Sequence, residues 1–211
     1  MTKIKISPYV KQRFPGIQMA ATEPFSPGKE EPDIGAWNEG IKANWELDTM
    51  ADHPVIKSYR DFFWSQEIDP TKTRPAGEAL IRAAFHRGLP KINPIVDAMN
   101  ISSAMTGIPM SSFDFRVIEG DFDVRFANPG ELYIPHTGSP INLKGSEVIL
   151  VNNENVLCLY PYRDSKFALI KKDTSRVIAV SYGVPGIADV AAPVRMMLQL
   201  LGAKSRIDVF S

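Results

Sequence analysis

The side chains that most often perform catalysis are few in this chain and lie far apart. His53, His86 and His136 are the only histidines, and Cys158 is the only cysteine. The chain contains none of the common local signatures of phosphate loops, dinucleotide folds, serine hydrolases or zinc proteases. One cysteine cannot form a disulfide or a thiolate zinc site within one chain. We therefore expect the histidines to be surface or capping residues, and we predict no metal and no cofactor.

Polar residues that could belong to a site are concentrated in residues 89–121. Asn93-Pro94 predicts the start of a helix that ends at Gly107, because asparagine caps helices and proline fits their first turn. Asn100 falls on a turn of this helix where the pattern predicts burial. A buried asparagine usually bonds neighbouring backbone, and the alternative is that Asn100 lines a cleft. The tripeptide Glu119-Gly120-Asp121 predicts a turn, with the glycine at positive φ.

The densest basic stretch, residues 163–176, is the strongest candidate for contact with a polyanion. It carries two aspartates and five basic residues: Arg163, Lys166, Lys171, Lys172 and Arg176. Such a run is typical either of a solvated hairpin face or of an edge that contacts phosphate groups, and both alternatives stay open. The whole chain has 24 basic and 24 acidic side chains. This balance excludes an overall basic field that would attract nucleic acid.

The elements that must position these residues follow from local patterns. Two short strands are expected at residues 4–6 and 17–21, and helices are expected to begin near residues 34, 54, 75 and 94. Short apolar runs then alternate with turn residues, at 122–126, 132–134, 147–151, 156–160 and 177–181. An apolar stripe at helical spacing follows Gly186 and ends at Leu201. This order predicts an α+β fold with a helical first half, a β-rich second half and a closing helix.

Length and composition favour one domain that spans residues 1–211. We divide it into N-terminal strands and helices (1–72), a central part (73–185) and a closing helix (186–211). No stretch approaches the roughly 18 apolar residues of a membrane span, so no membrane partner is expected. The first residues lack the apolar core of a secretory leader, and a single cysteine suits a reducing compartment. The expected location is the cytoplasm, and the sequence leaves the oligomeric state open.

The run LPKINPIVDAMNISSAMTGIPMSSFDFRVIEGDFDVRFA, which begins at Leu89, resembles the B3/B4 domain of the bacterial phenylalanyl-tRNA synthetase β subunit. The similarity extends over residues 74–185, through the DTSRVIAV segment at 173–180. The preceding TRPAGEAL, residues 73–80, looks like the freestanding relatives of that domain. The resemblance implies a layered α/β domain whose core is a β-sandwich of unusual topology, flanked by helices.

The resemblance also implies a function, because in the synthetase this domain hydrolyses tyrosine wrongly esterified to phenylalanine tRNA. The family's arginine before the Ile-Asn pair falls on Lys91, and its histidine before Ala-Phe-Asp falls on Ser111. The family's glutamate that recognises the tyrosine hydroxyl falls on Val180, or on Tyr182 in a shifted alignment. The family's Gly-Gly turn is replaced at residues 162–165. These differences imply a pocket for another side chain, or one that is catalytically silent.

Two functions of different class follow. The first is a freestanding trans-editing factor that hydrolyses a mischarged aminoacyl-tRNA. In it, Lys91 holds phosphate or carboxylate, while Ser111 and Asn100 orient water or the ribose. Further substrate contacts are expected from Asn93, Phe113, Glu119 and Tyr182, and the five basic residues of 163–176 would meet the acceptor stem. The alternative is a non-catalytic module that binds the tRNA 3′ end, an amino acid or a protein partner.

Overall fold

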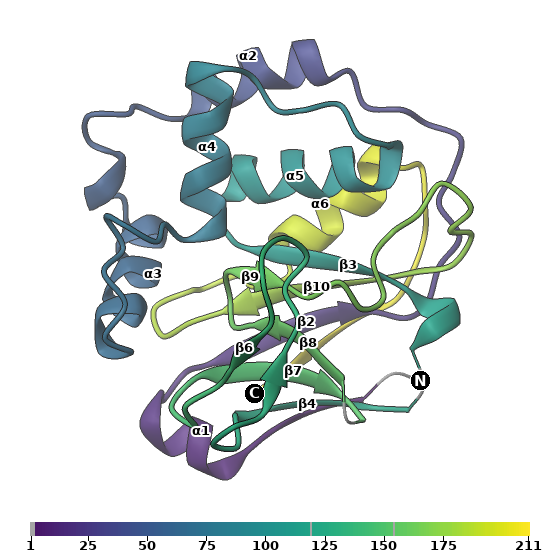
Figure 1. Ribbon diagram of the computed structural model, residues 1–211. Coiled ribbons are helices and arrows are strands. Elements are labelled where there is room, and N and C mark those ends of the chain that lie inside the picture. Colours follow the sequence, from purple (N-terminus) through teal and green to yellow (C-terminus); the bar gives the residue numbers. More distant parts are fainter. Residues whose placement is uncertain (1–2, 119, 154) are drawn as a thin grey trace.

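The computed structural model describes residues 3–118, 120–153 and 155–211 and has three layers: two β-sheets and a layer of helices (Figure 1). The first sheet has the strand order β1-β4-β7-β8-β9. Its strands are β1 (Ile4–Ile6), β4 (Phe122–Phe126), β7 (Val148–Asn152), β8 (Asn155–Leu159) and β9 (Arg163–Asp164). β1 pairs with β4 in parallel, and the other pairs are antiparallel.

The second sheet is fully antiparallel and has the order β11-β2-β10-β3. Its strands are β11 (Ile207–Phe210), β2 (Gln18–Thr22), β10 (Val177–Gly183) and β3 (Met110–Asp114). Every residue of β10 is buried. Because successive side chains of a strand point to opposite faces, Ile178, Val180 and Tyr182 face the first sheet, whereas Val177 and Ala179 face the helices.

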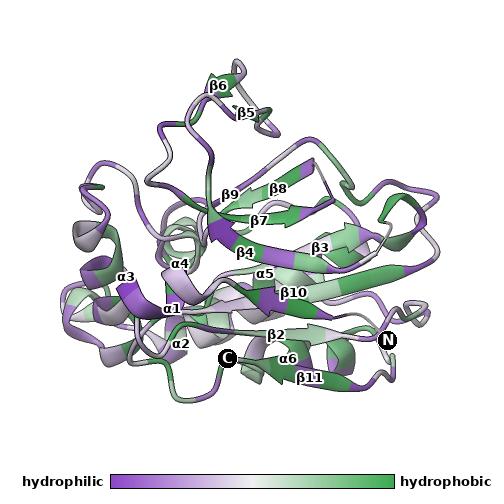
Figure 2. Cartoon of the chain, turned by 90° about the horizontal axis from the view of Figure 1, so that it is seen from below, coloured by the Kyte–Doolittle hydropathy of each residue, from purple (hydrophilic) through white to green (hydrophobic). Residues whose placement is uncertain are grey.

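The two sheets pack face to face, which confirms the predicted β-sandwich. Figure 2 shows β4, β7 and β8 stacked over β10, β2 and β11, with apolar residues along the strands of both sheets. One continuous core cluster joins the inner faces of the two sheets, with Val124, Leu150 and Leu157 from one sheet and Met19 and Ile178 from the other. This core packs the inner face of the second sheet against the first sheet, so a site on that face lies between the two sheets.

The α5 (Pro94–Thr106) and α6 (Ala192–Leu200) helices cover the outer face of the second sheet, and α2 (Ile34–Asn44) and α4 (Ala76–His86) pack against α5 above them (Figure 1). Two other helices, α1 (Pro8–Arg13) and α3 (Pro54–Ser65), add side chains to the sandwich core. Short 3-10 turns lie at Met50–Asp52 and Phe115–Val117. A hairpin of β5 (Leu132–Tyr133) and β6 (Ile141–Asn142) packs on the outer face of the first sheet through Tyr133 and Leu143.

The α5 helix begins and ends where the sequence predicted. The Asn93 side chain accepts a hydrogen bond from the Val96 amide at 3.0 Å, and Pro94 is the first helical residue. Gly107 ends the helix with φ +72°, a left-handed conformation that favours glycine. On α4, Gly77 lies so close that a Cβ there would be 2.3 Å from the Gly107 carbonyl oxygen. This close approach fixes the position from which β3 departs.

The structure corrects several details of the predicted elements. The last helix begins at Ala192 rather than after Gly186, because Gly186 has φ +95° and residues 187–191 form turns, in which Ile187 and Val190 are nevertheless buried. The segment at 162–165, where the family has a Gly-Gly turn, contains β9. Asn100 is only half-buried, and it is Asp97 that bonds neighbouring backbone, since its Oδ1 accepts from the Ile92 amide at 2.8 Å. None of the helices in the described part of the chain has both the length and the apolarity needed to cross a bilayer.

Candidate functional site

The candidate site lies on the inner face of the second sheet, where β3 and β10 are neighbours. Ser111 on β3 is paired directly with Val180 on β10, and Tyr182 lies two residues further along the same face. Both alternative positions for the family's glutamate are therefore next to the position of the family's histidine. The structure selects Tyr182 as the residue whose polar group reaches Ser111.

Three polar side chains form a hydrogen-bonded chain that joins the two sheets. The Tyr182 hydroxyl donates to Ser111 Oγ at 2.8 Å, and Ser111 Oγ donates to Asp164 Oδ1 at 2.6 Å. Asp164 belongs to β9, the edge strand of the first sheet. We call these three residues the Ser111 network. Since 53 residues separate Ser111 from Asp164, the network is a product of the tertiary fold.

Burial makes the Asp164 carboxyl group an unusually weak acid for an aspartate. Desolvation raises its pKa to about 6, although the hydrogen bond from Ser111, the neighbouring Cys158 thiol and the charge of His136 act in the opposite direction. At pH 7 such a group is about nine-tenths ionised, yet it accepts a proton far more readily than an ordinary aspartate. Carboxyl groups tuned in this way are frequent at catalytic sites.

The Tyr182 phenol and the neighbouring Cys158 thiol remain protonated at neutral pH. Burial raises the pKa of Tyr182 well above its ordinary value, so its phenol acts as a hydrogen-bond donor. Burial also raises the pKa of the Cys158 thiol, whose Sγ donates to the Leu159 carbonyl at 3.1 Å. Since the thiolate is the reactive form of cysteine, Cys158 is not a nucleophile here.

Residues 133–137 lie against β9 and hold Asp164 in place. The His136 amide donates to the Asp164 carbonyl at 2.9 Å, and the Tyr133 hydroxyl donates to the Arg163 carbonyl at 2.8 Å. The Arg163 guanidinium returns a bond to the Thr137 carbonyl at 2.9 Å. The His136 side chain is exposed. It therefore lies on the solvent side of Asp164, and its charge acts on the pKa of the Asp164 carboxyl group.

Only one member of the Ser111 network has appreciable contact with solvent. Ser111 is 2% exposed and Tyr182 is 1% exposed, whereas Asp164 is half-buried. Asp164 is therefore the member of the network that is most exposed to solvent. The serine hydroxyl bonds its carboxylate, and the tyrosine hydroxyl bonds the serine.

The structure separates some of the residues that the sequence proposed for one site. Ser111 follows the C-terminal end of α5, whereas Lys91 is exposed beyond its N-terminal end (Figure 1). A helix of this length is about 20 Å long, so Lys91 is remote from the Ser111 network. Asn93 is occupied as the N-cap of α5.

Phe113 and Asn100 occupy different environments. Phe113 is buried in the sandwich core against Phe122, with their ring centroids 6.5 Å apart. Asn100 lies half-buried in the middle of α5, and its side chain forms no hydrogen bond with a described residue. Glu119 lies outside the described residues. A direct substrate contact by any of these residues stays a prediction.

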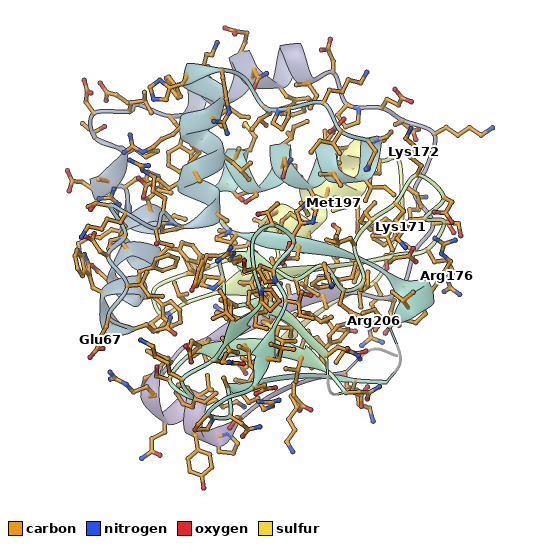
Figure 3. All side chains as sticks on the ribbon, in the orientation of Figure 1. Glu67, Lys171, Lys172, Arg176, Met197 and Arg206 are labelled. Atoms are coloured by element: carbon orange, nitrogen blue, oxygen red, sulfur yellow. The ribbon has the colours of Figure 1, made fainter. Side chains whose placement is uncertain are left out.

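The basic run at 163–176 does not form a single face. Arg163 and Lys166 lie beside residues 134–137, as the bond from the Lys166 amide to the Ile134 carbonyl shows. The exposed side chains of Lys171, Lys172 and Arg176 lie instead at the far edge of the molecule, together with Arg206 (Figure 3). The run is therefore divided into two groups, and its contact with phosphate stays a prediction. Its three C-terminal members remain available to solvent.

Sequence reasoning missed Asp164 and His136 as site residues. Asp164 was counted only as a negative charge within the basic run, and His136 was expected to be an ordinary surface residue. One signal pointed to Asp164, because it lies in the segment that replaces the family's Gly-Gly turn beside the pocket. No local spacing links either residue to Ser111.

The class that the structure defines is an α+β sandwich with a hydrogen-bonded serine–aspartate pair between its sheets. The B3/4 domain profile matches residues 58–197, so the chain belongs to the B3/4 domain family. Curated relatives are phenylalanine–tRNA ligase beta subunits. That of Lactobacillus acidophilus is 24% identical over 176 residues, which cover 79% of this chain and 21% of that subunit. That of Pseudoalteromonas translucida is 33% identical over 72 residues, or 34% of this chain and 9% of that subunit.

Among solved structures, an N-terminal fragment of the phenylalanyl-tRNA synthetase beta subunit from Pyrococcus horikoshii is similar at a TM-score of 0.49 and 13% identity. The match covers 98% of this chain and 50% of that fragment. The chain thus spans about a fifth of the length of the first curated relative, and about half of the solved fragment.

Proposed function

We propose that this chain recognises the 3′ end of an aminoacyl-tRNA and hydrolyses the ester of a mischarged amino acid. The observation that carries the proposal is the Ser111–Asp164 hydrogen bond of 2.6 Å, in which a carboxyl group with a pKa of about 6 is held at the family's pocket position. Family membership supports a tRNA-related substrate. An aminoacyl ester is already activated, so a positioned water and a general base are sufficient chemistry.

The reaction assigns a role to each member of the Ser111 network. The Asp164 carboxylate accepts a proton from water as the water oxygen forms a bond to the ester carbonyl carbon. The carbon–oxygen bond to the ribose then breaks, and the same proton passes from Asp164 to the departing ribose oxygen. The products are the free amino acid and the tRNA with its terminal hydroxyl restored. Ser111 and Tyr182 are positioning residues, since Ser111 donates a hydrogen bond to the carboxylate from the buried side and Tyr182 donates one to Ser111.

A second function, binding without hydrolysis, is favoured by a specific observation. The Tyr182 ring fills the space beside Ser111, its centroid lies 5.0 Å from that of Tyr160, and both tyrosines are buried. A filled pocket suits recognition of the tRNA end alone. In that case Asp164 would accept a hydrogen bond from the amino group or a ribose hydroxyl of the bound ligand. The two functions share the tRNA partner and differ in turnover.

The test is a panel of aminoacyl-tRNAs, each incubated with the protein while release of the amino acid is followed. We expect at least one mischarged species to be hydrolysed, and we expect Asp164→Asn to slow that hydrolysis about 100-fold or more, as loss of a general base does. The matched control is Asp123→Asn on β4, an exposed aspartate outside the network, which should retain the wild-type rate. Stable binding of tRNA with no hydrolysis of any species would instead support the second function.

We also propose that Lys171, Lys172 and Arg176 contact the acceptor stem. Their exposure at one edge supports this role (Figure 3). The Lys171→Ala/Lys172→Ala variant should weaken tRNA binding and reduce its dependence on salt by about 1 unit of log–log slope per lost phosphate contact. Unchanged affinity and slope would remove this edge from the interface.

A further inference from the structure

A shallow cleft of about 380 Å³ lies along the α4 helix, remote in sequence from the Ser111 network. Its lining consists of Arg74, Ala79, Arg82, Ala83, His86 and Arg87. Three arginines and a histidine thus surround it, and no carboxylate is among the described residues of the lining. The chain as a whole has no net charge, so this concentration of positive charge is local.

The shape of the cleft follows from helical spacing. Residues 79, 82, 83 and 86 fall on one face of α4, because residues three and four apart are neighbours on a helix. The alanines carry the shortest side chains of this face and form the floor. The longer side chains of Arg82 and His86 rise beside them, and Arg74 and Arg87 stand at the two ends of the helix. Small residues between basic ones are what make the surface concave.

A buried carboxylate, that of Glu78, holds one of these guanidinium groups, that of Arg82, in position. Glu78 is fully buried, and it accepts bonds from Arg60 Nε at 2.8 Å, Arg60 Nη2 at 2.9 Å and Arg82 Nε at 2.9 Å. Although burial raises the pKa of Glu78, the bonds from Arg60 and Arg82 lower it overall, so the group is ionised. Arg74 Nε lies 3.9 Å from the same carboxylate.

The anchoring leaves the outer ends of the arginines available. Arg82 uses its Nε on Glu78, and its two Nη groups form no hydrogen bond with a described residue. Within the described part of the chain, the side chains of His86 and Arg87 form no hydrogen bond or ion pair, and both are exposed. One buried negative charge therefore fixes the Nε of Arg82 without occupying the donors that face the cleft.

We propose that this α4 cleft binds phosphate groups. Planar guanidinium groups donate paired hydrogen bonds to phosphate oxygens, and a fixed Nε reduces the entropy lost on binding. Basic residues near a helix C-terminus also stabilise the helix dipole. The helix dipole could explain why His86 and Arg87 lie at the C-terminal end of α4. It does not explain the concave floor or the presence of Arg74 at the opposite end.

The phosphate group has two possible sources: the backbone of an RNA and free inorganic phosphate. The site is independent of ester hydrolysis, since it shares no residue with the Ser111 network. If the source is RNA, the cleft is an additional contact for the tRNA partner proposed above, and in that form it rests on the proposed function.

The experiment compares wild type with Arg74→Ala/Arg87→Ala and with Ala79→Glu. The first variant removes two exposed charges of the cleft. The second places a carboxylate on its floor, keeps every arginine and retains high helix propensity. The control is Lys5→Ala/Lys29→Ala, which removes two exposed charges elsewhere. Thermal unfolding followed by circular dichroism verifies that each variant is folded.

Binding of unfractionated tRNA is measured by fluorescence anisotropy between about 50 and 200 mM salt, and binding of inorganic phosphate by calorimetry. We expect both cleft variants to weaken tRNA binding about tenfold and to reduce the salt slope by about 1 to 2 units, with the control unchanged. Loss of phosphate binding alone, with tRNA affinity intact, would identify free phosphate as the source. Wild-type affinity of the folded cleft variants for both probes would overturn the proposal. A protein that binds through the cleft but hydrolyses no ester would retain this site and lose the proposed activity.

Discussion

Replacing Asp164 by asparagine should make the protein more stable at neutral pH while it removes activity. The folded state raises the pKa of this carboxyl group from 3.8 to about 6. The folded protein therefore holds its proton more tightly than the unfolded chain does. Above pH 6 the carboxylate is ionised in both states, and its charge is more costly in the folded state. Asp164 thus opposes folding at neutral pH, and this penalty disappears as the pH falls and the native state takes up a proton.

The magnitude follows from the two pKa values. Relative to the fully protonated state, the penalty is about 0.5 kcal/mol at pH 4, about 1.6 kcal/mol at pH 5 and about 3 kcal/mol at pH 7. Asparagine keeps an oxygen that can accept the Ser111 hydrogen bond, but its amide group needs an acceptor of its own. An unsatisfied amide costs about 1 to 3 kcal/mol. The net stabilisation at pH 7 is therefore smaller than 3 kcal/mol, whereas its dependence on pH is unaffected by this constant cost.

Urea unfolding of wild type and Asp164→Asn at several pH values from 4 to 8 measures this dependence. The unfolding free energy of the variant minus that of wild type should rise by about 2.5 kcal/mol between pH 4 and pH 7. Taking a difference cancels the titration of all other groups that the substitution leaves unperturbed. A flat difference for Asp164→Asn would refute the account of this carboxyl group.

Three further variants test the frame around the site. Asp114→Asn should lower the unfolding free energy at pH 7 by roughly 2 kcal/mol, because the hydrogen bonds from Arg116 hold the Asp114 pKa down to about 2. This stabilisation is present above pH 3.8 and is lost as the pH falls through 2. Acid unfolding of the variant should therefore match that of wild type near pH 2. Gly77→Ala should cost about 1 to 3 kcal/mol or prevent folding, since the new Cβ meets the Gly107 carbonyl at 2.3 Å, and a wild-type melting temperature would contradict that contact. Asn93→Ala should cost about 1 kcal/mol through loss of the α5 cap, as chemical denaturation would show, whereas Asn93→Ser should recover most of it.

The sequence was informative where the determining signals are local. The Asn93-Pro94 start and the Gly107 stop of α5 each depend on a few adjacent residues, and the structure confirms both. The strands at 122–126 and 177–181 were found because short apolar runs lie between turn residues. In contrast, β3 reads MSSFD and is buried at every position, so it shows no alternation of polar and apolar residues. Its two serines can be buried because each forms a hydrogen bond with another side chain inside the fold.

The site was harder to predict because its contacts connect distant parts of the chain. Ser111 was identified from the resemblance, but its partners Asp164 and Tyr182 lie 53 and 71 residues further on. The register of β3 on β10 brings one partner to it, and the edge strand of the opposite sheet brings the other. Lys91 shows the reverse case, since it is close to α5 in sequence but lies beyond the far end of that helix.

The most direct test of the account is the pH dependence of aminoacyl-ester hydrolysis by the intact chain. For any mischarged tRNA that the protein deacylates, we predict a rate that rises with a single apparent pKa near 6, which is the value assigned to Asp164. The same rise should be absent in Asp164→Asn and retained in Asp123→Asn. Hydrolysis of no aminoacyl-tRNA, or a rate that stays flat from pH 5 to pH 8, would contradict the claim that the Ser111 network is a catalytic site.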